Sequence, residues 1–350
     1  MTDLSIYFAF PGDLETPTGG YRYDRRLISE LRRMGINVET VALPHCSGMP
    51  NQPIQSSVQG TLAAIPDQAV VVIDGLAFGV MDNLAVAEAQ RLRLVALCHH
   101  PLALETGLEE RRRQALLVSE RRALKCARAT VVTSEHTSQI LIDQFAVPAE
   151  KICVAPPGTD RVPFAPCDGD PIRLLTVASL TRRKAHDVLI NSLAPLKALP
   201  WQARFVGGHD FDPAWARSLQ DQANTLELSQ RIHFAGTVED TQLEYQQADV
   251  FVLPSRFEGY GMVFAEALAA GLPVLAGHSG AVPDVVPEAA GLLVPPDDTQ
   301  ALTEALQQIL TGKALRQRLQ AGARKAAATL PSWTDTATLV ARKLEEVSNS

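Results

Sequence analysis

The sequence predicts an α/β protein with two parallel sheets, each covered by helices on both faces. Short apolar runs alternate with helical patterns along all 350 residues, as expected where each strand of a parallel sheet is followed by a helix. This length corresponds to two domains at the usual size of about 150 residues each. A stretch rich in proline, glycine and aspartate, "APPGTDRVPFAPCDGDP" at Ala155–Pro171, divides the chain as an interdomain linker would.

Six strands are expected before the linker and six after it. The first six are Leu4–Phe10, Val38–Leu43, Ala69–Ile73, Leu92–Leu97, Thr130–Thr133 and Ile152–Ala155. The second six are Ile172–Val177, Ala203–Val206, Ile232–Ala235, Val250–Leu253, Val274–Ala276 and Gly291–Val294, and an amphipathic helix, Trp333–Val347, ends the chain. Open parallel sheets bind ligands beyond the carboxyl ends of their strands, so the predicted site is a cleft where the two domains face each other.

Composition and charge exclude several classes of protein. The chain is 46% hydrophobic and 20% charged, as in ordinary globular proteins. It has no apolar run of membrane-spanning length, and "MTDLSIYFAF" lacks the basic start and long apolar core of a signal peptide, which predicts a cytoplasmic protein. The net charge of −7 argues against nucleic-acid binding. The five cysteines are scattered and form no C-x-x-C pair, so neither a disulfide framework nor a zinc site is indicated; they are Cys46, Cys98, Cys126, Cys153 and Cys167.

One segment departs from the acidic average. Glu109–Arg128, "EERRRQALLVSERRALKCAR", has seven basic and three acidic residues. It could be a helix that lies on a membrane surface. The interpretation we favour is an ordinary amphipathic helix with a solvated basic face, because Leu116, Leu117, Leu124 and Ala127 follow helical spacing.

The stretch "PSRFEGYGMVFAEALAAGLPVLAG", Pro254–Gly277, places two carboxylates, Glu258 and Glu266, beside a glycine-rich turn. The strand before it and the helical pattern after it predict a strand, a loop and a helix that ends at Gly271. Glycines let the backbone approach a ligand, and the helix that follows points its unpaired N–H groups at the loop. This arrangement suits an anion.

Other polar motifs also follow predicted strands. The loop "PGDLETPTGG" ends in Gly19 and Gly20 and opens a helix, but it lacks both the G-x-G-x-x-G spacing and the Walker lysine, which argues against a nicotinamide enzyme. "CHHP" places His99 and His100 at a strand end, in either a structural or a catalytic role. No further metal ligand stands at useful spacing from them.

The loop after the strand Ile172–Val177, "ASLTRRKAHD", gathers Arg182, Arg183 and Lys184. Each alone could be solvated, but a cluster of cations at a strand-to-helix turn suits a phosphate or diphosphate. The cations and the helix N-terminus would bind an anion, and the carboxylates would accept hydrogen bonds from hydroxyl groups. Together they predict a nucleotide sugar as the ligand, because it has both a diphosphate and hydroxyl groups.

These residues resemble a known family. Glu258, seven residues and Glu266 match the E-x7-E motif of the retaining family 4 glycosyltransferases, and shorter pieces follow in the family's order along nearly the whole chain. They are "TGG", "CHHP", "VVTSEHT", "VAPPGTD", "SLTRRKAHDVLI", "FVGG", "HFAGTV", "ADVFVLPS" and "AGLLVPPDD". The resemblance implies the GT-B fold: residues 1–157 on the acceptor side, residues 158–332 as the donor domain, and a final helix, 333–350, crossing back to the first domain.

The resemblance also implies roles for single residues. Four would act in catalysis: His99 near the transferred sugar, Glu258 on its hydroxyls, and Lys184 with Arg183 on the diphosphate. His100 is the alternative to His99. Other residues would bind the donor: Glu266 would contact the ribose, and backbone amides would contact the phosphate and sugar. The donor-binding set comprises Gly19, Gly20, Arg182, Gly207, Val238, Tyr260, Gly261, Met262, Val263 and Glu266.

Two positions depart from the family pattern near the diphosphate. Ser179 stands where many relatives have arginine, and Ala185 replaces the usual glycine after the lysine. Arg183 or Arg182 could therefore supply the missing charge.

The implied reaction moves a hexosyl unit from a nucleoside diphosphate sugar to a hydroxyl acceptor with retention of configuration. A UDP-sugar is favoured over a GDP-sugar as the donor. Neither a metal nor another cofactor is expected, because the resemblance implies that the cations and the helix N-terminus do the electrostatic work that a metal ion does in the other glycosyltransferase fold. The alternatives are an epimerase or phosphorylase on the same fold and a non-catalytic nucleotide-sugar-binding protein. The acceptor cannot be identified from the sequence, because the first-domain loops "LPHCSGMPNQP" and "HPLALETGLEE" contain no motif for a particular acceptor.

Overall fold

The computed structural model describes residues 4–44 and 52–350, and for residues 52–56 it describes the backbone alone. The chain divides into two units. Unit 1 comprises residues 1–158 and 331–350, and unit 2 comprises residues 159–330. These limits lie one or two residues from the domain limits expected from the sequence. Cys46 and most of the loop "LPHCSGMPNQP" fall outside the described residues.

Unit 1 contains a six-stranded parallel sheet in the order β2-β1-β3-β4-β5-β6. Its strands are β1 Ser5–Pro11, β2 Asn37–Leu43, β3 Val70–Asp74, β4 Arg93–Cys98, β5 Ala129–Val132 and β6 Ile152–Val154. Its helices are α1 Gly19–Arg33, α2 Gln52–Ala63, α3 Gly75–Phe78, α4 Asp82–Glu88, α5 Glu110–Cys126, α6 Glu135–Phe145 and α14 Trp333–Ser348, with 3₁₀ turns η1 Leu102–Leu104 and η2 Ala149–Lys151. The strand order reverses between β1 and β3, which is where a doubly wound sheet opens a crevice.

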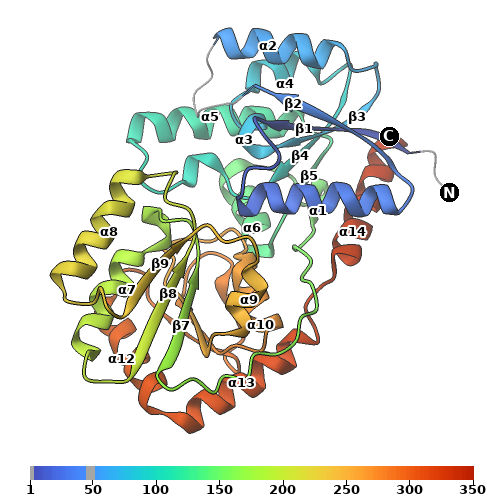
Figure 1. Ribbon diagram of the computed structural model, residues 1–350. Helices are drawn as coiled ribbons and strands as arrows, with labels where there is room; N and C mark the ends of the chain where they lie inside the picture. The colour runs from blue at the N-terminus through green and yellow to red at the C-terminus, as the bar shows by residue number, and fades with distance from the viewer. Residues whose placement is uncertain (1–3, 45–51) are drawn as a thin grey trace. The chain divides into compact units, whose positions relative to one another are not determined.

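The last helix, α14, belongs to unit 1 although it follows unit 2 in the sequence. Ser332 and Asp335 form a capping box at its start, and the buried Trp333 packs edge-on against Tyr23 of α1. Thr336 fastens the next turn by donating to the carbonyl of Pro156 at 2.6 Å. Helices α1 and α14 therefore lie side by side on one face of the sheet (Figure 1).

Unit 2 contains a second six-stranded parallel sheet, in the order β12-β11-β10-β7-β8-β9. Its strands are β7 Ile172–Val177, β8 Trp201–Val206, β9 Ile232–Gly236, β10 Val250–Leu253, β11 Val274–Gly277 and β12 Gly291–Val294. Its helices are α7 His186–Leu193, α8 Pro213–Thr225, α9 Thr241–Gln246, α10 Met262–Ala269, α11 Val282–Val285, α12 Thr299–Thr311 and α13 Lys313–Ala327, with turns η3 Arg182–Lys184 and η4 Ala194–Leu196. Numbered within the unit, this is the Rossmann order 3-2-1-4-5-6.

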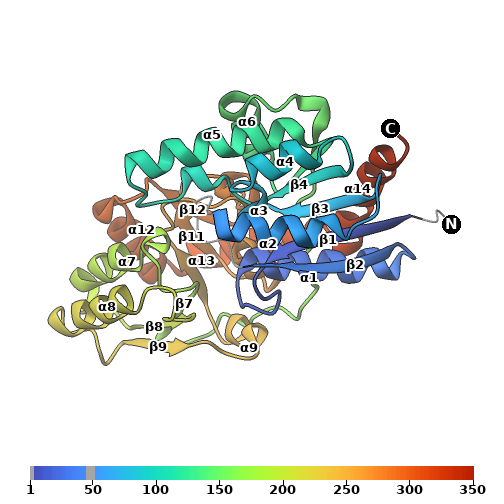
Figure 2. The ribbon, with the colours of Figure 1, turned by 90° about the horizontal axis from the view of Figure 1, so that it is seen from above.

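Two hydrophobic layers hold unit 2 together, one on each face of the sheet. Helices α7 and α12 pack against each other on one face (Figure 2), and α10 with α13 cover the other. Strand β10 is completely buried, as the continuous apolar run "VFVL" predicts for a central parallel strand. The sheet reverses between β7 and β10, so the loops after these two strands diverge and leave room for a ligand.

All twelve strands lie where the apolar runs predict them. Three have the expected limits, and the others differ by one or two residues at an end. The largest difference is at β8, which begins at Trp201 because this side chain is buried and its indole N–H donates to the carbonyl of Leu196. A tryptophan beside the apolar run is thus part of the core.

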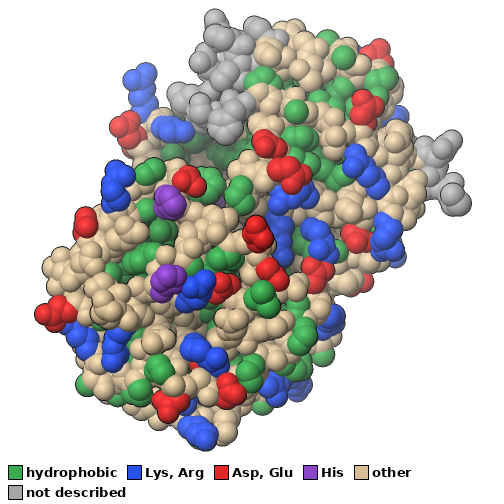
Figure 3. All heavy atoms as spheres, in the orientation of Figure 1, with side chains coloured by type: hydrophobic (Ala, Val, Ile, Leu, Met, Phe, Trp, Pro, Cys, Tyr) green, Lys and Arg blue, Asp and Glu red, His purple; other side chains and the backbone are tan. Residues whose placement is uncertain are grey.

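The basic segment forms α5 and packs as an amphipathic helix, with Leu116 and Leu124 buried and most of its cations exposed. No helix in the described part of the chain is long and apolar enough to cross a bilayer. Acidic and basic side chains alternate over the face shown in Figure 3. The cysteines of the described residues, Cys98, Cys126, Cys153 and Cys167, are free thiols.

Candidate functional site

The reversal point of unit 2 brings together the two loops that the sequence singled out. The loop after β7 contains Arg183 and Lys184, and the loop after β10 contains Glu258. These strands are hydrogen-bonded neighbours although about 75 residues separate them in the chain. The cations and the carboxylate therefore meet at the carboxyl edge of one sheet.

Glu258 forms a buried ion pair with both cations. Lys184 Nζ donates to Glu258 Oε1 at 2.6 Å, and Arg183 Nη1 donates to Oε2 at 3.2 Å. The Glu258 residue is 4% exposed. Burial raises the pKa of this carboxyl, but the charges of Lys184 and then Arg183 outweigh burial and lower the pKa to about 2. Glu258 is therefore an ionised acceptor at any physiological pH.

Arg256, which sequence reasoning did not select, ties the two loops together. Its backbone N–H donates to the carbonyl of Arg183 at 2.8 Å, and its guanidinium donates to the carbonyl of Arg182. The same guanidinium bonds Asp187 at 2.8 Å and Asp297 at 2.7 Å. A single arginine gives no sequence signal for this role, because all four of these partners are more than 40 residues away in the sequence.

The start of α10 offers backbone donors without a side-chain cap. Gly261 is the N-cap, with φ 84°; as a glycine it has no side chain that could cap the N–H groups, and the first turn of the helix has no acidic residue. A Cβ at Gly261 would lie 2.5 Å from Phe264, so this turn requires glycine. The amides of Gly261 and Met262 are therefore placed as an anion-binding helix start requires.

Glu266 lies one helical turn further along α10 and has a different environment. It is half-buried and accepts a hydrogen bond from the hydroxyl of Tyr245 at 2.9 Å. The two glutamates of the E-x7-E motif are thus held by different groups, Glu258 by cations and Glu266 by a phenol. Tyr260, between them, is half-buried, and burial raises its pKa to about 12.

The turn that contains Lys184 explains the departure from the family pattern at Ala185. Ala185 is buried in the left-handed conformation, with φ 53° and ψ 37°. This is the conformation that glycine adopts without steric cost, so a glycine at this position would fit the same turn.

The remaining predicted donor residues of unit 2 lie around these loops. Arg182 stacks on the ring of Trp215 at 4.3 Å, and its Nε lies 4.0 Å from Asp212 Oδ2. Gly207, after β8, approaches the carbonyl of Ala178, where a Cβ would lie 2.0 Å from the oxygen. Val238 follows β9, and both it and Val263 are half-buried beside the apolar layer. Arg182 therefore has different side-chain partners from Arg183 and Lys184, which contact Glu258.

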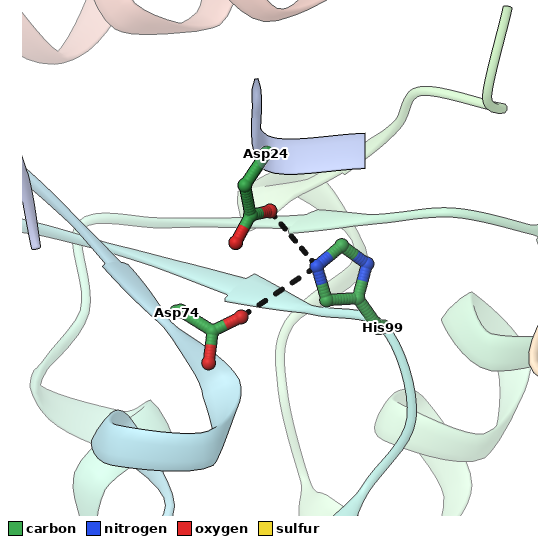
Figure 4. Close-up of side chains that lie close together, drawn as sticks. All are labelled: Asp24, Asp74 and His99. Atoms are coloured by element: carbon green, nitrogen blue, oxygen red, sulfur yellow. Dashed lines mark hydrogen bonds and ion pairs between the residues drawn. The ribbon is translucent and has the colours of Figure 1, made fainter. Parts of the chain in front are cut away.

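Unit 1 has its own polar cluster at the reversal point of its sheet. His99 follows β4, Asp74 ends β3, and Asp24 lies in the second turn of α1. His99 Nε2 is 3.0 Å from Asp24 Oδ1 and 3.6 Å from Asp74 Oδ2, as drawn in Figure 4. Burial lowers the pKa of His99, but Asp24 and then Asp74 outweigh this effect and raise it. Sequence reasoning selected His99 and missed both acids.

Among the described residues, these three side chains are the group whose spacing could also hold a metal ion, with one ligand atom from each within 4.8 Å of the others. The alternative histidine, His100, is half-buried and outside this group. Asp74 gave the same signal as His99, a polar residue that ends an apolar strand. Asp24 gave none, because it stands in the arginine-rich run "YRYDRRL".

The paired glycines open α1 as predicted but have different neighbours. Gly19 is the first residue of the helix, after the N-cap Thr18, and a Cβ there would meet nothing within 4 Å. A Cβ at Gly20 would lie 3.2 Å from Cδ2 of His99. Gly20 therefore allows the histidine ring to approach the helix.

Two family profiles match the chain, and together they cover most of it. Residues 17–162 match "Glycosyltransferase Family 4" and residues 163–326 match "Glycosyl transferases group 1". The chain belongs to glycosyltransferase family 4. Glu258, Glu266, the Lys184 turn and the start of α10 all lie within residues 163–326, the region that matches "Glycosyl transferases group 1".

Curated relatives of this family 4 chain are similar over part of their length. One is the D-inositol 3-phosphate glycosyltransferase of Kineococcus radiotolerans, 30% identical over 60% of this chain and 55% of the relative. Another is the MMP alpha-(1->4)-mannosyltransferase of Mycolicibacterium hassiacum, 29% identical over 70% of this chain and 63% of the relative. The matched region thus spans just over half of the first of these proteins.

Solved structures show the fold over nearly the whole of both chains. Sucrose-phosphate synthase from Thermosynechococcus elongatus has a TM-score of 0.81 at 22% identity, covering 97% of this chain and 98% of its own. HepE of Anabaena, solved with UDP-glucose, has a TM-score of 0.77 at 19% identity, covering 97% and 100%. With its two six-stranded parallel sheets, the family 4 chain has the GT-B fold.

Proposed function

We propose that this protein transfers a hexosyl unit from a nucleoside diphosphate sugar to a hydroxyl group of an acceptor, with retention of configuration. The observation that carries the proposal is the buried cluster of Glu258, Lys184 and Arg183 beside the open start of α10. It combines donors for a diphosphate with a fixed, ionised acceptor for sugar hydroxyls.

The diphosphate is the leaving group, and its charge grows as the glycosidic bond breaks. Lys184 has three N–H donors and Arg183 has five, so pairing with Glu258 uses part of their capacity. The amides of Gly261 and Met262 at the helix start add preorganised dipoles. Together these groups stabilise the leaving diphosphate without a proton transfer.

The two glutamates would bind different hydroxyl groups of the donor. Glu258, held in place by two cations, would accept hydrogen bonds from the transferred sugar, and its charge would favour the oxocarbenium-like transition state. Glu266, oriented by Tyr245, would accept from the ribose. The acceptor hydroxyl would then attack on the side from which the diphosphate departs, and that phosphate would take the proton.

The names of relatives and structural neighbours point to two donor classes. HepE was solved with UDP-glucose, whereas a relative from Corynebacterium glutamicum, 31% identical over half of this chain, is named a GDP-mannose-dependent mannosyltransferase. We propose that a UDP-sugar is favoured over a GDP-sugar as the donor. The named acceptors of relatives include D-inositol 3-phosphate, so phosphorylated polyols and sugars belong in the acceptor panel.

The test incubates the full chain with UDP-glucose or GDP-mannose and a panel of acceptors, and reads products by mass spectrometry. The proposal expects released nucleotide and a glycosylated acceptor whose anomeric configuration, by NMR, equals that of the donor. An isomerised donor without an acceptor identifies an epimerase, and a sugar 1-phosphate formed from phosphate identifies a phosphorylase. Saturable donor binding with no product in any reaction identifies a binding protein. An inverted product contradicts the retaining mechanism alone.

Glu258→Gln provides the residue-level test of the same site. This variant keeps the size of the side chain and removes its charge, so kcat should fall while donor affinity, measured by calorimetry, changes little. The matched control is Glu227→Gln, which removes an exposed carboxylate paired with Lys197 on the surface of the same unit. An unchanged kcat in Glu258→Gln contradicts the proposed role of this residue.

A further inference from the structure

The two carboxylates beside His99 need an explanation, because burying charged groups is costly. Asp24 is 0% exposed and Asp74 is 1% exposed. A buried carboxylate costs several kcal/mol unless a cation or several hydrogen bonds compensate for it. Asp74 Oδ1 accepts the backbone N–H of Leu76 at 2.8 Å, but Asp24 Oδ2 is buried without a hydrogen-bond partner among the described residues. The fold therefore keeps two acids where their own environment does not favour them.

Both acids act on the same atom of His99. Nε2 lies between them, and the second ring nitrogen, Nδ1, points away from both carboxylates (Figure 4). The ring packs edge-on against Tyr23 at 5.1 Å, and Gly20 leaves space for it against α1. The orientation of the imidazole is thus fixed from two sides.

We propose that Asp24 and Asp74 are positioning residues that keep the His99 imidazole protonated and turn its Nδ1–H away from them, toward the ligand. Such an imidazolium is suited to donate to an oxygen that carries or develops negative charge. Under the proposed function, on which this inference rests, that oxygen belongs to the transferred sugar or to the diphosphate. His99 would then work as a charged hydrogen-bond donor and not as a general base, which needs a neutral ring.

The charged and titratable groups around His99 support this protonation state. Helix α1 contributes Asp24 and Tyr23, the end of β3 contributes Asp74, and its own strand end contributes Cys98 and His100. Burial and the neighbouring Asp24 raise the pKa of Asp74 to about 7, while burial raises those of Tyr23 and Cys98 well above their usual values. Asp24 is the acid nearer to Nε2, and the negative charge of Asp74 grows as pH rises through about 7.

The first measurement is the titration of His99 by NMR of its ring signals in the full chain, which does not depend on activity. Asp24→Asn keeps the shape of the side chain and removes the nearer charge. We expect the pKa of His99 to fall by one unit or more in this variant, and by less in Asp74→Asn, because Asp24 is the closer acid. Asp82→Asn is the control, since Asp82 is a buried acid of the same unit that pairs with Arg122.

The second measurement is the pH profile of kcat/KM for transfer. If Asp24→Asn changes only the protonation of His99, the ratio of wild-type to variant kcat/KM should be about tenfold larger at pH 8 than at pH 6. The reason is that a pKa lower by one unit reduces the protonated fraction of His99 by up to tenfold. A merely structural role predicts the same deficit at both pH values. The NMR titration remains decisive if no transferase activity is found.

Three outcomes overturn the inference. One is an unchanged pKa of His99 in both variants. Another is a pH-independent loss of activity. The third is a saturable shift of the His99 signals on adding Zn²⁺ or Mn²⁺ to the wild type that disappears in Asp24→Asn, which would make the cluster a metal site. If Asp24→Asn does not fold, Asp74→Asn carries the test above pH 7, where the Asp74 carboxyl, with its pKa of about 7, is mostly charged in the wild type.

Discussion

Replacing Lys184 by methionine removes the closest cation from the buried Glu258 carboxylate. The pKa of Glu258 is about 2 against an ordinary value of 4.5, and at about 1.4 kcal/mol per pKa unit this difference corresponds to about 3 kcal/mol in favour of the charged form. Lys184 is the larger of the two charge effects, so Lys184→Met should lower the free energy of unfolding of unit 2 by about 2–3 kcal/mol at pH 7.

A double variant, Lys184→Met with Glu258→Gln, gives a sharper test, because the direction of its change in stability relative to Lys184→Met alone is predicted. Glu258→Gln removes the charge that Lys184→Met leaves buried, so the double variant should be more stable than Lys184→Met alone. The control is Lys197→Met, whose partner Glu227 is 2.8 Å away but exposed, and which should cost less than about 1 kcal/mol.

The assay is urea unfolding of the full chain, read for peptides of β7 and β10 by pulsed hydrogen exchange and mass spectrometry, so that unit 2 is followed by itself. Because the folded pKa of Glu258 is depressed, its contribution to stability is present above pH 4.5 and is lost as pH falls through about 2. The penalty of Lys184→Met should therefore shrink as pH is lowered from 7 toward 4.5, since the Glu258 carboxyl, having lost its closest cation, can take up a proton. A double variant less stable than Lys184→Met would refute the argument.

Three further predictions concern the donor site and the first helix. Glu266→Gln should raise the donor KM more than it lowers kcat, because a ribose contact is equal in ground and transition states, and a dominant loss of kcat would contradict this. Turnover should survive excess EDTA; complete loss that Mg²⁺ or Mn²⁺ restores would show that a metal is required. Gly20→Ala should reduce kcat/KM by about tenfold or more, since its methyl group would meet His99 at 3.2 Å, whereas Gly19→Ala, with nothing within 4 Å, should have a smaller effect. Equal losses of kcat/KM in Gly19→Ala and Gly20→Ala would contradict the explanation that the methyl group at Gly20 displaces His99.

The sequence predicts the strands well because each is a continuous apolar run buried on both faces. It also predicts which loops bear function, since polar residues that end such runs share one edge of a sheet; His99 and the Lys184 turn were found in this way. It cannot predict which loops are neighbours, because strand order is a property of the folded sheet. The contact between Lys184 and Glu258 and the role of Arg256 therefore needed the structure.

The same limit explains why Asp24 was missed. In sequence it stands among arginines at the start of a helix, where an acid is ordinarily solvated. Only the packing of α1 on the sheet shows that this acid is buried and faces His99. Single buried acids are exceptions to the average behaviour on which sequence reasoning depends.

Arg256 makes the two loops at the reversal point of unit 2 behave as one exchangeable part. Arg256 bonds Arg182, Arg183, Asp187 and Asp297, so replacing either loop alone would remove or misplace some of these contacts. Engineering of donor preference in this scaffold therefore has to exchange residues 179–187 and 254–262 as a pair. A chimera with only one of them should lose the alignment of Glu258 with Lys184 before it gains a new donor.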